Sequence, residues 1–443
     1  MNFLVMLLQI LLTVVCILTA ATSILFFIRL RWPAPVWWIL KLYASSLSYF
    51  IVFTGIICMI AGWTMHSTFL FTIASYIVLV YAAHFLLVTA APKQSGSFEN
   101  AFGIQYESRI KPDQKKFFLS SRRIFSLPEV SEPGFIKDLP FATIAESSRT
   151  IYADLWHPAE TTKPSKLAFI FLHGSAFYFL DKDMGTRPLF RHLTAQGHLI
   201  MDVAYRLAPE TDIMGMVHDV KRAIHWIKSN AAEYQINPDR IVVGGGSAGG
   251  TLALMAAYTA KDDRFTPPEL TGKDLSCEGV ISLYGPTDLA AHYYHTRQHL
   301  TTREVPGQPK KKVPTQMPEW IKKKMGSDYH RLGLDKGFEK AGALAPLLGG
   351  HPDECADTYA FYSPLTHVHA KCPPTLLIHG GHDLMAPVRT TRLLKERLSG
   401  KNIPVVMHIL PQTDHAFDMA LPKLSPATHS AIYDMERFLA MMV

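Results

Sequence analysis

The residues best suited to chemistry lie in the segment Val243–Gly250, where a serine stands among small residues. Residues 241–243 are Ile, Val and Val, residues 244–246 are glycines, Ser247 follows, and Leu252–Met255 begin a helical pattern. A serine on a sharp strand-to-helix turn has its hydroxyl pushed into the open, and small residues must stand two positions to either side because a Cβ there would clash. The pattern predicts a nucleophile elbow with Ser247 as the attacking group.

Two candidate partners follow Ser247 in the chain. A serine hydroxyl attacks well only when an imidazole takes its proton, and the imidazole needs a carboxylate to hold its tautomer. Asp383 comes after the apolar run 375–379, and His415 comes after the apolar run 405–410. Each follows the carboxyl end of a predicted strand, where the loops of a parallel sheet converge. The order serine, acid, histidine is the one found in α/β hydrolases.

Two other carboxylates, Asp414 and Asp418, compete with Asp383 for the role of the acid because they flank His415. A neighbour on the same short loop reaches the Nδ1 side of the imidazole with difficulty, so Asp383 is favoured. The chain has 20 histidines, so residue type alone does not identify the base. His415 is favoured as the base because it follows a predicted strand and comes after the serine and the acid in the chain.

A second loop adds a further part of the pattern. The sequence His173-Gly174-Ser175-Ala176-Phe177 directly follows the apolar run 167–172. In this fold the loop after the third strand supplies backbone amides that bind the developing oxyanion, together with the amide of the residue after the nucleophile, here Ala248. Such a donor is worth about 3–4 kcal/mol in the transition state. His173 and Gly174 are interpreted as residues that shape this loop, and His173 is not expected to act as a base.

These motifs, together with Tyr205–Glu210 (Tyr-Arg-Leu-Ala-Pro-Glu) and Tyr362–Leu365 (Tyr-Ser-Pro-Leu), make residues 150–443 similar to the hormone-sensitive-lipase-like carboxylesterases of the α/β-hydrolase superfamily. The resemblance implies that the amides of Ser175, Ala176 and Ala248 form the oxyanion hole. It also implies an acyl-enzyme mechanism without a cofactor.

The chain departs from the family pattern at two places. Ser175 and Ala176 stand where glycines are usual, and backbone donors tolerate this change only if the loop needs no positive φ there. Ala204 stands where the family usually has an aspartate before the tyrosine. Three nearby charged residues are interpreted as structural groups: Asp202, Arg206 and Glu210.

The rest of this region alternates strand and helix patterns, which predicts a mostly parallel sheet covered on both faces, the α/β-hydrolase fold. The expected strands are residues 151–156, 168–173, 199–204, 241–245, 279–283, 375–379 and 406–410. The expected helices lie near residues 184–196, 213–234, 248–260, 388–399 and 427–442.

The first part of the chain has the composition of a membrane region. Residues 3–28 contain no Asp, Glu, Lys or Arg, and neither do residues 42–92. An uncharged apolar run of this length is sufficient to cross a bilayer and too long for the core of a signal peptide. We expect three membrane helices, about 3–28, 44–63 and 67–90; the alternative is two helices with one buried or re-entrant segment. The aromatic residues expected at the headgroup level are Trp32, Trp37, Trp38 and Tyr43.

Basic residues predict the orientation of this region. The first loop carries Arg29, Arg31 and Lys41 without an acidic residue, the second loop has no Lys or Arg, and residues 93–123 carry seven. The positive-inside rule places the amino terminus outside and the catalytic domain in the cytosol. Cys277, Cys355 and Cys372 are the only cysteines after the membrane region, and an odd number without a framework spacing argues against a disulfide-bonded exterior domain.

The expected domain organisation is a membrane region over residues 1–92, a connector over 93–140 that packs on the hydrolase as a flap, and a catalytic domain over 141–443 with a lid insertion at about 287–361. Residues 292–331 within the lid contain nine Lys or Arg and only three Asp or Glu. This lid is interpreted either as a solvated, mobile segment or as a surface that docks on an anionic leaflet, with Met317, Trp320 and Ile321 entering the interface.

The sequence therefore predicts a membrane-anchored serine carboxylesterase or lipase in which Ser247 attacks, His415 transfers the proton and Asp383 orients His415. The expected partners are a small-molecule or lipid ester and the membrane; no metal, cofactor or nucleic acid is expected, and the oligomeric state is open. Three alternatives remain: a serine peptidase or deacylase, an acyltransferase with the same acyl-enzyme, and a non-catalytic binding module.

Overall fold

A single eight-stranded sheet forms the centre of the catalytic body in the computed structural model, which describes residues 3–28, 34–145, 147–300 and 344–443. The strands are β1 Gly134–Ile144, β2 Arg149–His157, β3 Ala168–Leu172, β4 Leu199–Ala204, β5 Ile241–Gly246, β6 Gly279–Leu283, β7 Thr375–Gly380 and β8 Val405–Leu410. Their order is β1-β2-β4-β3-β5-β6-β7-β8. β1 and β2 pair antiparallel, β2 also runs antiparallel to β4, and the remaining neighbours are parallel. The prediction of a mostly parallel α/β sheet is confirmed.

Helices cover both faces of the sheet, because its central strands are apolar on both sides. Every residue of β3, β5 and β6 is buried, as continuous apolar strands in parallel sheets require. α8 (Ile213–Ser229), α9 (Ala248–Tyr258) and α15 (Val388–Ser399) pack in one core, and α7 (Arg187–Thr194) and α16 (Pro426–Met441) pack in a second core. The expected helices are therefore present, with shorter ends for α7 and α8.

β1 is the strand that the sequence did not predict. It contains Lys137, Asp138 and Pro140, and its pairing with β2 shifts register twice, between Ile136 and Leu139 and between Pro140 and Ala142. Charges, a proline and bulges are typical of edge strands, and they hide the alternation on which strand prediction depends. The expected boundary between connector and catalytic domain at 140/141 falls inside this strand.

The connector packs on the catalytic body. It contains α5 (Phe98–Phe102), α6 (Pro112–Lys115) and two short 3₁₀ turns, η2 (Gln94–Gly96) and η3 (Tyr106–Arg109). Phe98, Tyr106 and Leu119 are buried in the same core as Phe438 of α16. The connector therefore extends the core formed by α7, α16 and this face of the sheet.

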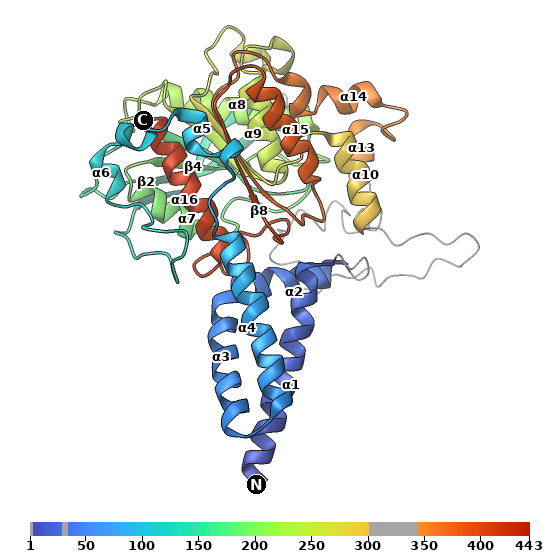
Figure 1. Ribbon diagram of the computed structural model, residues 1–443. Coiled ribbons are helices and arrows are strands. Elements are labelled where there is room, and N and C mark those ends of the chain that lie inside the picture. The colour runs from blue at the N-terminus through green and yellow to red at the C-terminus, as the bar shows by residue number, and fades with distance from the viewer. Residues whose placement is uncertain (1–2, 29–33, 146, 301–343) are drawn as a thin grey trace.

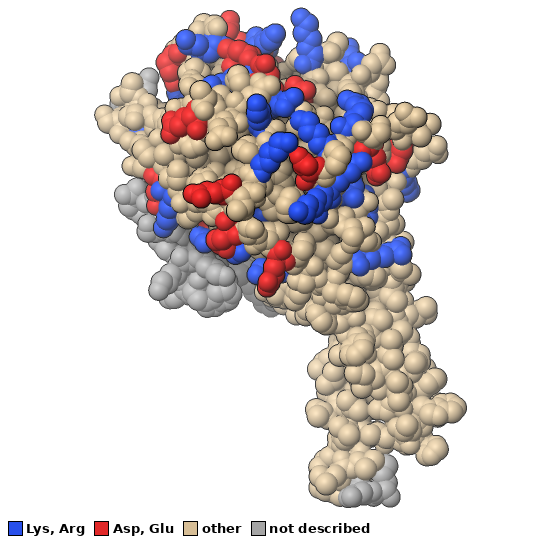
Figure 2. Space-filling model, turned by 90° about the vertical axis from the view of Figure 1, so that its left-hand side faces the viewer, with Lys and Arg blue, Asp and Glu red and all other residues tan. Residues whose placement is uncertain are grey.

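A stalk of helices extends from the catalytic body (Figure 1). Its helices are α1 (Phe3–Ser23, continued by η1 Ile24–Phe26), α2 (Ala34–Ser46), α3 (Ser48–Thr64) and α4 (Thr68–Val88). Figure 2 shows charged side chains over the catalytic body and none along the visible face of the stalk. Residues 3–26 and α4 are each long and apolar enough to cross a membrane, and α2 with α3 forms a bent pair with a 73° break.

The expected continuous helix over 44–63 is therefore wrong. Residues 44–46 belong to α2, and the upright helix α3 begins only at Ser48. α3 alone has 17 residues, about 26 Å at 1.5 Å per residue, which is slightly less than the roughly 30 Å hydrocarbon core of a bilayer. Among the residues that the structure describes there are thus two helices of membrane-spanning length, or three spans if the bent pair counts as one.

The described parts of the expected lid are α10 (Leu289–Leu300), α13 (Leu344–Leu348) and α14 (Ala356–Phe361). Most of its basic residues, and the three apolar residues Met317, Trp320 and Ile321, lie outside the described residues.

Candidate active site

Ser247 occupies the turn between β5 and α9. Its backbone has φ +54° and ψ −122°, a conformation that costs a non-glycine residue of order 1–3 kcal/mol and that the surrounding structure must hold. Its amide donates a hydrogen bond to the carbonyl of Leu283 at 2.9 Å. A Cβ at Gly245 or Gly249 would lie 2.3 or 2.1 Å from the carbonyl oxygen of Leu172. The two glycines are required because the turn packs directly against the end of β3.

The structure brings Ser247, His415 and Asp383 together. The Nε2 atom of His415 lies 2.8 Å from the hydroxyl oxygen of Ser247, and its Nδ1 lies 2.8 Å from Oδ2 of Asp383. Because a carboxylate only accepts hydrogen bonds, Nδ1 carries the proton and Nε2 accepts from the serine hydroxyl. Both distances lie within the range needed for proton transfer in the ground state.

The carboxylate of Asp383 is held from several sides. Its Oδ1 accepts hydrogen bonds from the amides of Met385 and Ala386, both at 2.7 Å, and its Oδ2 lies 3.2 Å from Nε2 of His379. Burial by itself raises the pKa of Asp383, but the charge of His415 and the hydrogen bonds from His379 and His415 outweigh it, so the pKa falls well below its usual range. Asp383 is ionised throughout the neutral pH range.

The same pair sets the basicity of His415. Burial lowers the pKa of His415, whereas the charge and hydrogen bond of Asp383 raise it, and the net shift is upward from the ordinary value of 6.5. A raised pKa means a more basic imidazole, which suits a group that takes a proton from a serine hydroxyl.

The two competing carboxylates have other partners. Oδ1 of Asp414 accepts hydrogen bonds from the amides of Leu384 and His415 at 2.9 and 2.8 Å, and its Oδ2 pairs with Lys41 at 3.1 Å. Asp418 accepts a hydrogen bond from the hydroxyl of Tyr284. Asp383 is therefore the carboxylate that the structure places at Nδ1 of His415.

The loop after β3 lies against Ser247. A Cβ on Gly174 would lie 3.3 Å from Cβ of Ser247. The Ser175 hydroxyl donates to the Tyr205 hydroxyl at 2.7 Å and accepts from the amide of Phe177 at 2.9 Å. Ala176 has φ +44°, so the loop does use a left-handed conformation at a position where the resembled family has glycine. The buried Ser175 hydroxyl holds the loop in this conformation, a bond that glycine could not make.

His173 lies in this loop as a buried, neutral ring. It stacks on Tyr205 with 4.5 Å between ring centroids, and the Tyr205 hydroxyl donates to its carbonyl oxygen at 2.7 Å. Burial lowers the pKa of His173 to about 4, so the ring is uncharged at neutral pH. These contacts fit a role in shaping the loop.

The charged residues interpreted as structural make ion pairs or backbone bonds. Arg206 pairs with Asp219 at 2.8 Å, and Glu210 pairs with Arg149 at 3.1 Å. Asp202 accepts from the amide of Asp183 at 2.8 Å, and burial raises its pKa to about 8.

Sequence reasoning missed several residues around His415. Tyr284, φ +43°, lies edge-on to the His415 ring at 4.7 Å between centroids. His295 of α10 bonds the carbonyl oxygen of Asp383 at 3.0 Å. Lys41 and Trp38 of the stalk bond Asp414 and the carbonyl oxygen of His415. One signal for Lys41 existed in the sequence, because it is the only Lys, Arg, Asp or Glu between Arg31 and Lys93.

A small, mainly apolar cavity lies next to these groups. Its lining includes Leu283, whose carbonyl accepts from Ser247, and Asp418, the partner of Tyr284. Met419 and the α16 residues Ile432 and Met435 form part of its apolar wall.

Two curated proteins similar to this chain are named as ester hydrolases. The chain is 29% identical over 297 residues to the probable carboxylic ester hydrolase LipM of Mycobacterium tuberculosis, covering 67% of this chain and 59% of LipM. It is 27% identical over 268 residues to esterase LipC of the same organism, covering 60% of this chain and 57% of LipC. The matched region thus spans less than two thirds of either relative.

Solved structures and family models give the fold and the family. A truncated carbohydrate esterase from gut microbiota superposes with a TM-score of 0.50 at 20% identity, covering 71% of this chain and 99% of that chain, a likeness in fold. The family model BD-FAE matches residues 153–329 and 314–398. Because these matches cover more than half of the chain, the protein belongs to the BD-FAE family of α/β hydrolases.

Proposed function

We propose that this protein is a membrane-anchored serine carboxylesterase with Ser247 as nucleophile, His415 as base and Asp383 as the orienting acid. The observation that carries the proposal is the chain of two 2.8 Å hydrogen bonds from Ser247 through His415 to Asp383. Membership of the BD-FAE family and the esterase names of the relatives support the same activity class.

The proposed reaction follows from these positions. The Ser247 oxygen attacks the ester carbonyl carbon while its proton passes to Nε2 of His415, and Asp383 stabilises the imidazolium. The tetrahedral oxyanion accepts hydrogen bonds from the amides of Ala248, Ser175 and Ala176. Collapse breaks the ester bond, and the alcohol leaves with the proton from His415. Water then attacks the acyl-Ser247 ester with His415 again as base, which releases the carboxylic acid.

The membrane anchor is supported by the surface of the stalk. Large apolar side chains face outward along it, for example Leu4 (69% exposed), Leu18 (63%) and Leu79 (70%). A contiguous surface of this kind is unfavourable in water and is matched by a bilayer. In Figure 1 the amino terminus lies at the end of the stalk away from the catalytic body. We propose that α1, α3 and α4 cross the membrane and that α2 lies at its surface.

The proposed orientation keeps the catalytic body in the cytosol, with the amino terminus on the other side. Of the three basic residues in the first loop, Lys41 is buried against Asp414, so the positive-inside argument rests on Arg29, Arg31 and the connector. Protease digestion of sealed vesicles tests it: a carboxyl-terminal tag is expected to be cut from the cytosolic face, and an amino-terminal tag to be protected.

The activity is tested with the full-length protein in detergent and a p-nitrophenyl ester series of increasing acyl length. We expect hydrolysis of short esters and labelling by a fluorophosphonate, both abolished in Ser247→Ala. Ser126→Ala, an exposed serine in the connector, is the matched control and should behave as the wild type. Labelling that persists in Ser247→Ala would refute the assignment of the nucleophile.

A further inference from the structure

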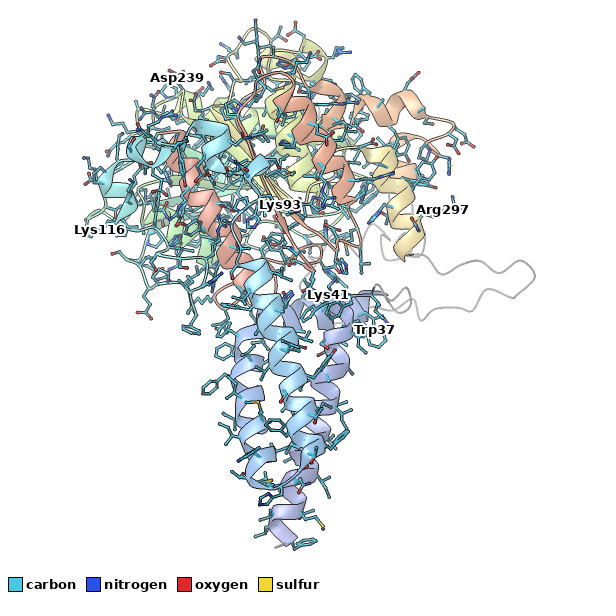
Figure 3. All side chains as sticks on the ribbon, in the orientation of Figure 1. Trp37, Lys41, Lys93, Lys116, Asp239 and Arg297 are labelled. Carbon is cyan, nitrogen blue, oxygen red and sulfur yellow. The ribbon has the colours of Figure 1, made fainter. Side chains whose placement is uncertain are left out.

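α2 lies at the junction between the stalk and the catalytic body (Figures 1 and 3). It packs against α16, and its inner face meets the loop of residues 411–420, which we call the histidine loop because it carries His415. Figure 3 shows Lys41 at this junction. The sequence had placed this segment in a loop at the headgroup level, where its tryptophans would contact lipid.

Two side chains of α2 bond to the histidine loop on either side of the His415 peptide. The indole N–H of Trp38 donates to the carbonyl oxygen of His415 at 2.9 Å. The Lys41 ammonium donates to Oδ2 of Asp414 at 3.1 Å, and the two side chains are only 4% and 0% exposed. The other oxygen of Asp414 accepts from the amide of His415. Both peptide groups of His415 are thus tied, directly or through one carboxylate, to α2.

The same carboxylate also reaches the acid. Oδ1 of Asp414 accepts from the amide of Leu384, the residue after Asp383, at 2.9 Å. Lys41 therefore holds one carboxylate that bonds the backbone beside His415 and the backbone beside Asp383. The buried Lys41–Asp414 pair thus links the loops that carry the base and the acid, in addition to the backbone bond from the amide of His382 to the carbonyl oxygen of Thr413 at 2.9 Å.

Other stalk residues hold the ends of the histidine loop. The Ser46 hydroxyl at the end of α2 donates to the carbonyl oxygen of Ala420 at 2.8 Å. His84 of α4 bonds the Gln412 side chain at 3.1 Å and accepts from the Ser45 hydroxyl at 2.8 Å. The loop is thus attached at Gln412, Asp414, His415 and Ala420.

The histidine loop needs such support because its own backbone is strained. Gln412 and Ala416 have φ +58° and +56°, the left-handed region that non-glycine residues rarely occupy. A loop with two such residues keeps this conformation only if contacts from outside the loop hold it. Those contacts come in part from the stalk helices α2 and α4.

We propose that α2 is a positioning element of the active site, in which Lys41 and Trp38 fix the histidine loop so that the His415 ring meets Ser247 and Asp383. This inference rests on the proposed esterase function. Neither residue bonds Ser247, so both act through His415 and are positioning residues. A displacement of about 1 Å of a catalytic group costs on the order of a hundredfold in rate, which makes the loop sensitive to loss of these bonds.

The test uses the full-length protein in detergent micelles with a short p-nitrophenyl ester, and kcat is expressed per site labelled by the fluorophosphonate. The variants are Lys41→Met, which keeps the length of the side chain, and Trp38→Phe, which keeps an aromatic ring and removes the donor. Lys93→Met and Trp63→Phe are the matched controls, because Lys93 is exposed just beyond α4 and Trp63 is 73% exposed on α3. Thermal unfolding is measured for every variant.

We expect kcat per labelled site to fall about tenfold or more in Lys41→Met and about threefold in Trp38→Phe, with KM within twofold of the wild type. Fluorophosphonate labelling of Ser247 should slow by similar factors, and both controls should match the wild type. A purely structural role would instead reduce the number of labelled sites and leave kcat per site unchanged. That result, or wild-type kcat in both α2 variants, would overturn the proposal.

The design separates this inference from the proposed function. If the wild type neither hydrolyses esters nor reacts with the fluorophosphonate, the esterase assignment fails. If the wild type is active, Ser247→Ala is inactive and the α2 variants behave as the wild type, only the positioning role fails. Trp38→Phe keeps the test decisive if Lys41→Met does not fold.

Discussion

The connector and the stalk helix α2 each contribute one basic side chain to a buried ion pair with the catalytic body, and the two pairs are similar in geometry. Arg122 of the connector bonds both oxygens of Asp434 in α16, with its Nη1 at 2.9 Å from Oδ2. Lys41 of α2 bonds Asp414 at 3.1 Å. All four side chains are at most 9% exposed. The difference lies in what each aspartate touches next.

Asp434 lies in a helix on one face of the sheet, and its further partner is His408 of β8, with Nδ1 at 2.7 Å. Asp414 bonds the backbone beside His415 and Asp383. The first pair therefore connects the connector to α16, whereas the second connects α2 to the backbone beside the proposed base and acid. We therefore expect loss of the Arg122–Asp434 pair to lower stability and loss of the Lys41–Asp414 pair to lower turnover.

The largest expected loss of kcat follows from removing the carboxylate that contacts His415. Asp383→Asn removes the charge that stabilises the imidazolium and disturbs the tautomer, so kcat should fall on the order of 10³–10⁴-fold, well beyond the loss expected for Lys41→Met. Asp239→Asn, an exposed aspartate in the turn before β5, should have no effect. Esterase kinetics on folded protein measure this, and a loss below tenfold would contradict the assignment of the acid.

The next effect breaks the connector pair. Arg122→Met leaves Asp434 buried with His408 as its remaining side-chain partner, and breaking a buried pair from one side costs about 3–5 kcal/mol of unfolding free energy. Denaturant unfolding measures the loss, with the exposed neighbour Arg123→Met as control. Because the side chain of Asp434 bonds Arg122 and His408 and none of Ser247, His415 and Asp383, kcat per labelled site should stay at the wild-type value. A parallel loss of kcat would abolish the contrast with Lys41.

The stability supplied by Asp434 also has a defined pH range. Burial raises the pKa of Asp434, but Arg122 and His408 outweigh it and lower the pKa to about 2. An aspartate in the unfolded chain has a pKa near 3.9. The stabilisation is therefore fully present above that pH and is lost as the pH falls toward 2. Arg122→Met should weaken this acid-dependent component, seen as a shallower fall in unfolding free energy below about pH 4.

The pH dependence of activity separates the two regions in another way. The pKa of His415 is raised above 6.5, and the neutral imidazole is the active form. We expect kcat/KM to be constant at higher pH and to fall tenfold per pH unit below a midpoint above about 6.5. Asp383→Asn should lower this midpoint, because the carboxylate that raises the pKa is gone, and Arg122→Met should leave it unchanged. A wild-type midpoint below 6.5 would contradict the raised pKa.

The smallest effect is expected at an exposed ion pair. Arg149 and Glu210 lie 3.1 Å apart with side chains 50% and 41% exposed, so solvent screens their attraction. Arg149→Met should change the unfolding free energy by less than about 1 kcal/mol and leave kcat unchanged. A loss comparable to that of Arg122→Met would show that exposure does not govern the difference between these pairs.

Much of the catalytic body could be predicted because its signals are local. Glycines around Ser247 and apolar runs bounded by turns are visible in short stretches of sequence, and the order of the serine, acid and histidine follows from the positions of these stretches along the chain. The continuous apolar strands β3, β5 and β6 were predicted with nearly correct ends. β1 was missed, because its charges, proline and bulges remove the alternation that marks a strand.

Three membrane helices were expected from the sequence, and two of them, 3–28 and 67–90, correspond to apolar helices of membrane-spanning length, since an uncharged run needs no partner to be recognised. The sequence could not place the break at Leu47, which separates α2 from α3 without a proline or glycine at that position. The surroundings of α2 decide this bend: its inner face bonds the histidine loop while α3 packs along α4.

The sequence by itself determined which residue types are present for nucleophilic catalysis, in what order, and that an apolar segment precedes them. Only the tertiary structure decided which carboxylate meets His415 and what holds the histidine loop in place. Asp383, Asp414 and Asp418 are equivalent as residue types, and Lys41 lies more than 300 positions from its partner. Their roles depend on distances of about 3 Å between segments far apart in the chain, and such distances exist only after folding.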